Sequence, residues 1–336
     1  MPIKIPLKQA GSNKPHIPPK SATAGSSDHP THPLDKQYLS PFIDWLTINV
    51  SPPDGDQHDI YNAFWTAVDD AELFADATAA EKKAFGTGFN VAKRLVLPSI
   101  ETEKKRPSLF VRHLVTTKRI AKLRLNFVPV DLGVAGMMEL HAAINTIVPD
   151  GWEYVAKHGR ITRIDVAVDL PDLTMDSIHF LPKKPAHMLQ LSPGGEIETI
   201  YFGKPKSNQI AIYDRAKKRA KLGQEMPQCL RIERKLKPGG MKLTSLPAMG
   251  NPFADTKFLI ALPGPPNPAK EKEWTLFSDS VEKRGLAAAL ALLPKDRRTA
   301  YKKHLSANAL PAWKPEEIWA GWVPMIEELK IASAHW

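Results

Sequence analysis

The segment Ile161-Thr162-Arg163-Ile164-Asp165-Val166-Ala167-Val168-Asp169 alternates apolar and polar side chains as a half-buried β-strand does. Successive side chains of a strand point to opposite faces of its sheet. One face therefore carries Ile164, Val166 and Val168. The other carries Arg163, Asp165, Ala167 and Asp169.

Two carboxylates on one face of an otherwise apolar strand, separated by a small alanine, are typical of ligands for a hard cation. Oxygen ligands of this kind suit Mg²⁺ or Mn²⁺. Asp165 and Asp169 are therefore candidate metal ligands. The alternative is a solvated sheet face on which Arg163 pairs with its neighbour Asp165.

A second strand is predicted at Leu230-Arg231-Ile232-Glu233-Arg234-Lys235. Arg231, Glu233 and Lys235 share one face of it. Glu233 is a third candidate metal ligand, or it is neutralised by the two flanking cations.

Tyr213 ends a predicted strand, Gln209–Tyr213, and opens a basic helix, Asp214–Leu222. Backbone N–H groups at a helix start and nearby cations favour negative charge. A phenol placed there could attack a phosphodiester, because cations stabilise both the phenolate and the transferring phosphoryl group. The alternative is a tyrosine that only packs its ring at a strand end.

The remaining pattern predicts an α+β fold, with a mainly antiparallel sheet and flanking helices. Further strands are predicted at 42–50, 109–115, 123–128 and 199–202, and helices at 59–84 and 136–148. Pro, Gly and Ser clusters mark the boundaries of the predicted regions. These are a disordered basic tail (1–37), a catalytic domain (38–240), a Pro/Gly-rich linker (241–273) and a small helical C-terminal module (274–336).

Composition narrows the function classes. The 336 residues are 43% hydrophobic and 24% charged, which excludes a wholly disordered chain, and no apolar run is long enough to span a membrane. The formal net charge of +10 favours polyanionic partners, nucleic acid first. A single cysteine, Cys229, excludes an intramolecular disulfide, and the start of the chain lacks the apolar core of a signal peptide, so we expect a cytoplasmic protein.

Five short motifs in order resemble the replication initiation factor family, which comprises rolling-circle initiators of small plasmids and filamentous phages and related conjugative relaxases. The resemblance covers about residues 38–240, and, as in that family, the sequence has no His-hydrophobe-His motif. The motifs are Asp44-Trp45-Leu46-Thr47-Ile48, Thr162-Arg163-Ile164-Asp165 with Asp169, Tyr201-Phe202-Gly203 before Ser207, Ile212-Tyr213-Asp214-Arg215, and Arg231-Ile232-Glu233.

The resemblance implies a Rep nickase-like fold and a metal-dependent DNA strand transferase. Tyr213 would attack the origin strand, and Asp165, Asp169 and Glu233 would bind Mg²⁺ or Mn²⁺. Arg215 stands where the family often has lysine, which keeps the charge. The cations expected to position DNA phosphates are Arg163, Arg215, Lys217, Lys218 and Arg231.

The expected reaction is nicking and rejoining of origin DNA through a 5′-phosphotyrosine, which leaves a 3′-OH that can prime a polymerase. The substrate would be duplex with an unpaired segment, and single strand. Candidate further partners are a host helicase, a host polymerase and a second copy of the chain, with no membrane. Two alternatives remain at this point: a non-catalytic DNA-binding regulator, and a metal-dependent endonuclease that uses water.

Overall fold

The computed structural model describes residues 39–79, 82, 88–175, 178–181, 186–191, 197–204, 208–311 and 313–333. They belong to one compact unit, Pro33–Trp336. The predicted tail, 1–37, lies outside the described residues. No described helix is both long and apolar enough to cross a bilayer.

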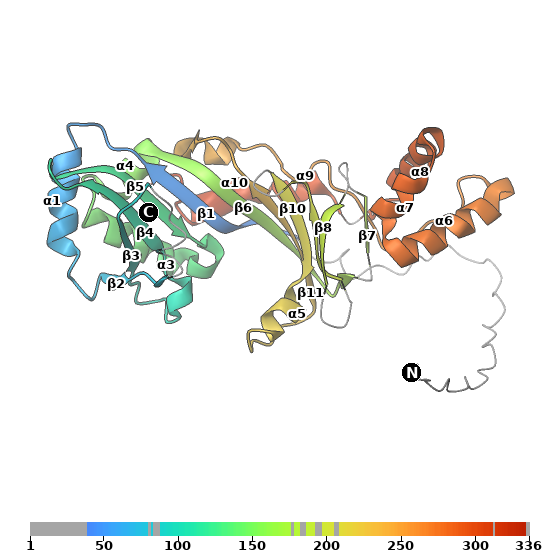
Figure 1. Ribbon diagram of the computed structural model, residues 1–336, viewed down its shortest axis with the longest axis horizontal. Coiled ribbons are helices and arrows are strands. Elements are labelled where there is room, and N and C mark those ends of the chain that lie inside the picture. The colour runs from blue at the N-terminus through green and yellow to red at the C-terminus, as the bar shows by residue number, and fades with distance from the viewer. Residues whose placement is uncertain are drawn as a thin grey trace, which may run out of the picture. The chain divides into compact units, whose positions relative to one another are not determined.

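The structure is a mixed helix-and-strand fold built on a large antiparallel sheet flanked by helices, which confirms the predicted fold class (Figure 1). Within the described residues the strands follow the order β2-β3-β4-β5-β1-β6-β11-β10-β9-β8, and β12 also pairs with β6. Their bounds are β1 Phe42–Val50, β2 Phe74–Asp76, β3 Val91–Leu95, β4 Ser108–Leu114, β5 Arg119–Phe127, β6 Gly159–Pro171, β8 Ala186–Leu191, β9 Ile197–Phe202, β10 Gln209–Asp214, β11 Cys229–Leu236 and β12 Met241–Lys242. A separate pair joins β7 (His179–Phe180) to β13 (Phe258–Leu259).

One face of the sheet is apolar and buried. Ile164, Val166 and Val168 of β6 are fully buried, as the alternation predicts, beside Ile232 of β11. The helices are α1 Gln57–Ala67, α3 Pro129–Asn145, α4 Gly151–His158, α5 Arg215–Ala220, α6 Glu271–Arg284, α7 Leu286–Leu292, α8 Lys295–Ala307, α9 Pro315–Trp319 and α10 Trp322–Glu328. Side chains of α1, α3, α4, α9 and α10 join the main core with this face. The opposite face of the central strands is therefore left for polar side chains.

The predicted helix at 59–84 ends at Ala67 instead. The chain turns at residues 69–73 and forms β2, which pairs with β3. Phe74 of β2 packs edge-on against Phe64 of α1, with ring centroids 5.9 Å apart. Burial of both rings favours the turn over continued helix, because tertiary packing outweighs local helix propensity.

The C-terminal residues divide between two cores. Helices α6 to α8 form their own cluster around Trp274 and Tyr301, whereas Trp322 and Ile331 join the main core. The indole of Trp322 donates to the carbonyl of Leu246 at 3.0 Å, within the stretch predicted as a linker. That stretch also forms β12 and β13. The boundaries of the functional domains stay a prediction.

Candidate functional site on the polar face of the sheet

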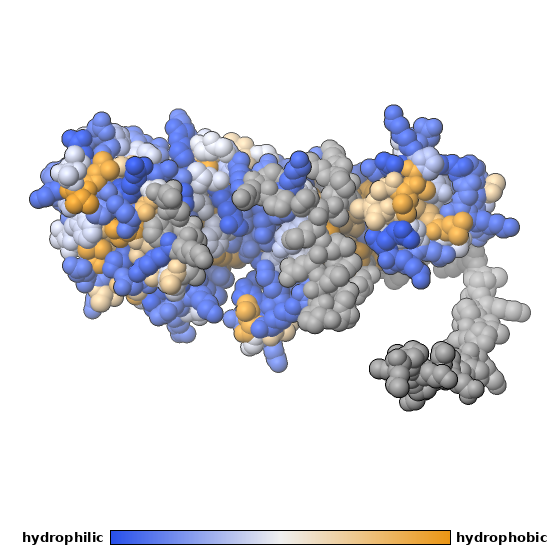
Figure 2. All heavy atoms as spheres, in the orientation of Figure 1, coloured by the Kyte–Doolittle hydropathy of each residue, from blue (hydrophilic) through white to orange (hydrophobic). Residues whose placement is uncertain are grey.

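Tyr213 lies at the junction of β10 and α5. Asp214 is the N-cap of α5, and its carboxylate accepts a hydrogen bond from the backbone N–H of Lys217 at 2.9 Å. Capping ends the strand and starts the helix at this residue, because it satisfies a backbone donor that the first helical turn leaves free. The tyrosine is thereby fixed at the edge between a rigid strand and a basic helix. In Figures 1 and 2 this helix extends from the sheet as a mainly hydrophilic protrusion.

Two rows of directly paired residues cross the polar face at this point. The first runs Thr199, Tyr213, Arg231, Asp169 over β9, β10, β11 and β6. The second runs Tyr201, Ala211, Glu233, Ala167 over the same strands. Residues paired in an antiparallel sheet share a face. The register therefore brings Tyr213 beside Glu233, with a small alanine on each side of the glutamate.

The Tyr213 phenol and the Glu233 carboxylate line the same small pocket. The tyrosine is only 5% exposed and Glu233 4%. Burial, followed by the negative charges of Glu233 and Asp44, raises the pKa of the Tyr213 phenol. We predicted that cations would favour the phenolate here. That prediction is wrong, because burial and the two carboxylates outweigh Arg231.

Asp44 reaches this site through a β-bulge. The pairing of β1 with β6 shifts between Ile43 and Trp45, so Asp44 is an extra residue in β1. Bulges re-aim side chains and are common beside active sites. The Asp44 carboxylate accepts a hydrogen bond from Arg231. Burial raises its pKa, and the charge of Glu233 raises it further.

Arg231 is the buried cation of the site. Its side chain is 3% exposed and donates to both oxygens of Asp169, at 2.6 and 2.9 Å, as well as to Asp44. The pKa of Arg231 is raised, because hydrogen bonds and charges of these carboxylates outweigh burial. A buried guanidinium that bonds two carboxylates holds these groups in place, and its predicted role in positioning a DNA phosphate stays a prediction.

Three of the other predicted cations, Arg215, Lys217 and Lys218, belong to α5, and Arg163 lies on β6 six residues from Asp169. Arg215 pairs with Asp169, and Arg163 pairs with Asp165. Lys217 and Lys218 are exposed on α5, and the Lys218 ammonium lies 4.2 Å from the centre of the Tyr213 ring. Lys235, which we proposed only as a neutralising partner, lies 3.4 Å from Glu233. A small pocket of about 150 Å³ is lined by Tyr213, Lys217, Lys218, Glu233 and Lys235, among others.

The three predicted metal ligands do not gather into one cluster. Asp165 is tied to Arg163 by two hydrogen bonds, one of 3.0 Å, and Asp169 is tied to Arg231 and Arg215. Among the described residues no three His, Cys, Asp or Glu side chains are placed to share an ion. Their role as ligands stays a prediction. The acid that lies with Glu233 near the phenol is Asp44, to which we had given no role.

The lone cysteine, Cys229, is a buried free thiol. Burial is the main cause that raises the pKa of Cys229, to about 11. The thiol is therefore protonated at neutral pH, which excludes it as an activated nucleophile.

Comparison with known proteins gives a limited result. The sequence matches no family model and no curated protein. Among solved structures, the chain is similar to that of a rolling circle replication initiator protein from Geobacillus stearothermophilus, with 15% sequence identity and a TM-score of 0.38. The match covers 74% of this chain and 98% of that one. A similarity this weak supports no argument about chemistry. The function is therefore inferred from the residues of the site.

Proposed function

We propose that this chain initiates replication by nicking and rejoining DNA through a covalent bond to Tyr213. The observation that supports this most strongly is the strand register that sets the Tyr213 phenol beside the Glu233 carboxylate, in a small pocket edged by lysines. A tyrosine that merely packs its ring needs neither a buried carboxylate at its hydroxyl nor this ring of cations. The five motifs of the replication initiation factor family include both residues.

The proposed first step is attack of the Tyr213 oxygen on a phosphodiester. Because the phenol is held neutral, it must lose its proton as it attacks, and Glu233, which lines the same pocket, is the base that we assign to accept it. The bond from tyrosine oxygen to phosphorus forms, and the bond from phosphorus to the 3′ oxygen breaks. The leaving oxygen takes a proton from solvent, which gives a free 3′-OH and a 5′-phosphotyrosine, and the phenol proton stays on Glu233.

Rejoining is the reverse reaction. A 3′-OH loses its proton to solvent and attacks the phosphotyrosine, the bond from phosphorus to the tyrosine oxygen breaks as the phosphodiester forms again, and the proton on Glu233 returns to the tyrosine. No nucleotide hydrolysis is needed, since the covalent link retains the energy of the cleaved bond. Lys217, Lys218 and Lys235 are placed to offset the charge of the transferring phosphoryl group.

A divalent cation fits the same group of acids. Mg²⁺ in phosphoryl-transfer sites is held by one or two carboxylates together with the substrate phosphate. Asp44 and Glu233 lie close enough for the charge of one to raise the pKa of the other, a repulsion that a cation would relieve. They, rather than Asp165 with Asp169, are the carboxylates we expect to hold Mg²⁺ or Mn²⁺. When bound, the ion would stabilise charge on the phosphate and on the leaving 3′ oxygen.

Incubation with end-labelled origin DNA, followed by a denaturing gel, tests the proposal. We expect protein-linked DNA with the wild-type chain and none with Tyr213→Phe, which keeps the ring but removes the nucleophile. Duplex binding should be nearly unchanged by this substitution. Free nicked DNA without an adduct would favour a water-using endonuclease, and no cleavage would favour a non-catalytic regulator. Either outcome would overturn the proposal.

A further inference from the structure

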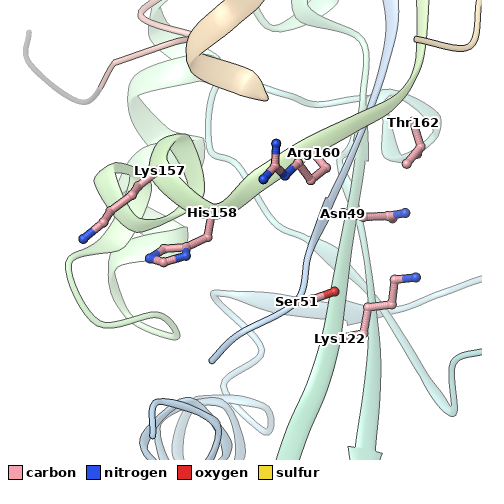
Figure 3. A pocket seen from close by; sticks show the side chains of 7 residues that line it. All are labelled: Asn49, Ser51, Lys122, Lys157, His158, Arg160 and Thr162. Atoms are coloured by element: carbon pink, nitrogen blue, oxygen red, sulfur yellow. The ribbon is translucent and has the colours of Figure 1, made fainter. Parts of the chain in front are cut away.

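A second, larger pocket lies at the other end of the polar face. It has a volume of about 470 Å³. Figure 3 shows its side chains, which come from the end of α4, the start of β6 and the adjoining strands β1 and β5. We call it the basic pocket. Its lining residues are Asn49, Ser51, Lys122, Lys157, His158, Arg160 and Thr162.

The charge of the basic pocket is one-sided. It contains three permanent cations, Lys122, Lys157 and Arg160, and no carboxylate. In the part of the chain that the structure describes, none of these three cations has a carboxylate within ion-pair distance. Four other cations of the polar face, Arg163, Arg215, Arg231 and Lys235, differ in this respect, since each contacts an acid.

The strand register concentrates further positive charge beside the pocket. Arg160 of β6 lies directly opposite Lys242 of β12 on one side and Asn49 of β1 on the other. Asn49 in turn lies opposite Arg124 of β5 and accepts a hydrogen bond from it at 2.9 Å. Like charges directly opposite each other destabilise a sheet. The cations of this row repel one another, and the row itself contains no acid that would reduce the repulsion. Such a row is suited to an anionic partner.

The basic pocket and Tyr213 lie on the same face. On β1, Thr47 and Asn49 are two residues apart and therefore share a face. Thr47 pairs with Arg163 of β6, and Asn49 pairs with Arg160, because the register shifts by one residue at Thr162. Arg160 and Arg163 therefore lie on the same face. Arg163 shares its face with Asp169, which is tied to Arg231 beside Tyr213. The nine-residue step along β6 from Asp169 to Arg160 corresponds to roughly 30 Å at 3.3 Å per residue. A DNA duplex rising 3.4 Å per base pair covers this length with about nine base pairs.

We propose that the basic pocket binds the phosphate backbone of duplex DNA next to the segment that Tyr213 cleaves. The inference rests on the proposed function, because it assigns a second contact to the same substrate. Duplex suits the pocket better than single strand, since single-strand sites combine cations with free aromatic platforms on which bases stack. The one aromatic side chain in the lining, His158, already has its ring 4.3 Å from the ring of Tyr154.

The test is the salt dependence of duplex binding, measured by fluorescence anisotropy with a fluorescein-labelled 20-base-pair origin duplex over a range of KCl concentrations. The pocket variant carries Lys122→Gln, Lys157→Gln and Arg160→Gln. Each phosphate contact contributes about −0.9 to the slope of log K against log salt. For this triple variant we expect the slope to become shallower by about two to three. Lys157→Gln alone should make it shallower by about one. Because Lys157 is exposed, this single substitution should leave the fold intact.

The matched control removes the same charge elsewhere. Lys272, Lys283 and Lys303 are exposed on α6 and α8, and Lys272→Gln, Lys283→Gln and Lys303→Gln should leave the slope within about 0.5 of wild type. An unchanged slope in the pocket variant, or an equal loss in the control, would overturn the inference.

The adduct gel separates this inference from the proposed function. A shallower slope with no tyrosine adduct would retain the pocket as a DNA site and reject the nicking chemistry. An adduct with an unchanged slope would reject the pocket alone.

Discussion

The two ends of the polar face use charge in opposite ways. Around Tyr213 the buried charged groups are paired, as in the contacts of Arg231 with Asp44 and Asp169, and exposed lysines of α5 lie at the rim. Around Arg160 the cations are mostly exposed and face no acid. Buried pairs fix geometry and shift pKa values, whereas exposed cations supply affinity that salt weakens. The comparison suggests that chemistry and substrate binding are separated along one sheet.

The largest effect should come from the base that we assign to Tyr213. Glu233→Gln keeps the shape and a hydrogen-bond acceptor but cannot take the proton, so we expect adduct formation at neutral pH to fall by about 10²–10⁴-fold. Single-turnover cleavage of labelled origin DNA measures this. Asp172→Asn, an exposed carboxylate after β6, is the control and should leave the rate unchanged. A Glu233→Gln rate within a few-fold of wild type would remove Glu233 from the mechanism.

The second prediction concerns which carboxylate binds the divalent cation. If Asp44 is a ligand and Asp165 only an ion-pair partner of Arg163, Asp44→Asn should weaken Mn²⁺ binding about tenfold or more, in the range seen when metal-site residues are changed. Asp165→Asn should have little effect. Calorimetric titration with Mn²⁺ in the absence of DNA reports this without reference to activity. The reverse ranking would restore the ligand set that the sequence predicts.

Arg231 tests what a buried pair contributes to stability. Arg231→Ala leaves Asp169 and Asp44 without their shared cation, so we expect the free energy of unfolding to fall by about 3–5 kcal/mol. Lys105 of the half-exposed pair with Asp131, 3.3 Å apart, is the comparison, and Lys105→Ala should cost about 0.2–1 kcal/mol. Urea denaturation of both variants measures the difference. Equal losses would contradict the distinction between buried and exposed charge.

The smallest expected effect concerns pH. The phenol of Tyr213 has a raised pKa in the folded chain, and an unfolded tyrosine titrates near about 10. The unfolded state therefore loses this proton first as pH rises, so the stabilisation is complete below about pH 10 and lost above it. Between pH 8 and 11 the melting temperature of wild type should fall more steeply than that of Tyr213→Phe. Parallel curves would mean that the pKa of the Tyr213 phenol is not raised in the folded chain.

Periodicity predicted the strands that build the site, because alternation is a local property. Ile164, Val166 and Val168 are buried, and Tyr213 and Glu233 share the opposite face. The sequence analysis gave Asp44 no role in the site, because the position of its side chain depends on a bulge in the pairing of β1 with β6. No local pattern in β1 reveals this bulge. The one available signal was an isolated aspartate within an apolar strand.

The sequence also could not predict which acidic residues pair with arginines on neighbouring strands. The sequence offered Asp165, Asp169 and Glu233 as equivalent acids, but the register decides which of them meets an arginine. Asp169 lies directly opposite Arg231 and is neutralised, whereas Glu233 lies opposite alanines and faces the phenol. The short helix α4 was not predicted, because its eight residues give too little periodicity to identify a helix.

The most direct test of the central claim is mass spectrometry of the covalent adduct after digestion with trypsin and nuclease. The two candidate tyrosines fall in different peptides, since Tyr213 lies in Ser207–Arg215 and Tyr201 precedes Lys206. We predict a nucleotide on Tyr213 in the peptide Ser207–Arg215. A nucleotide on Tyr201, or on neither peptide while DNA is cleaved, would contradict the account.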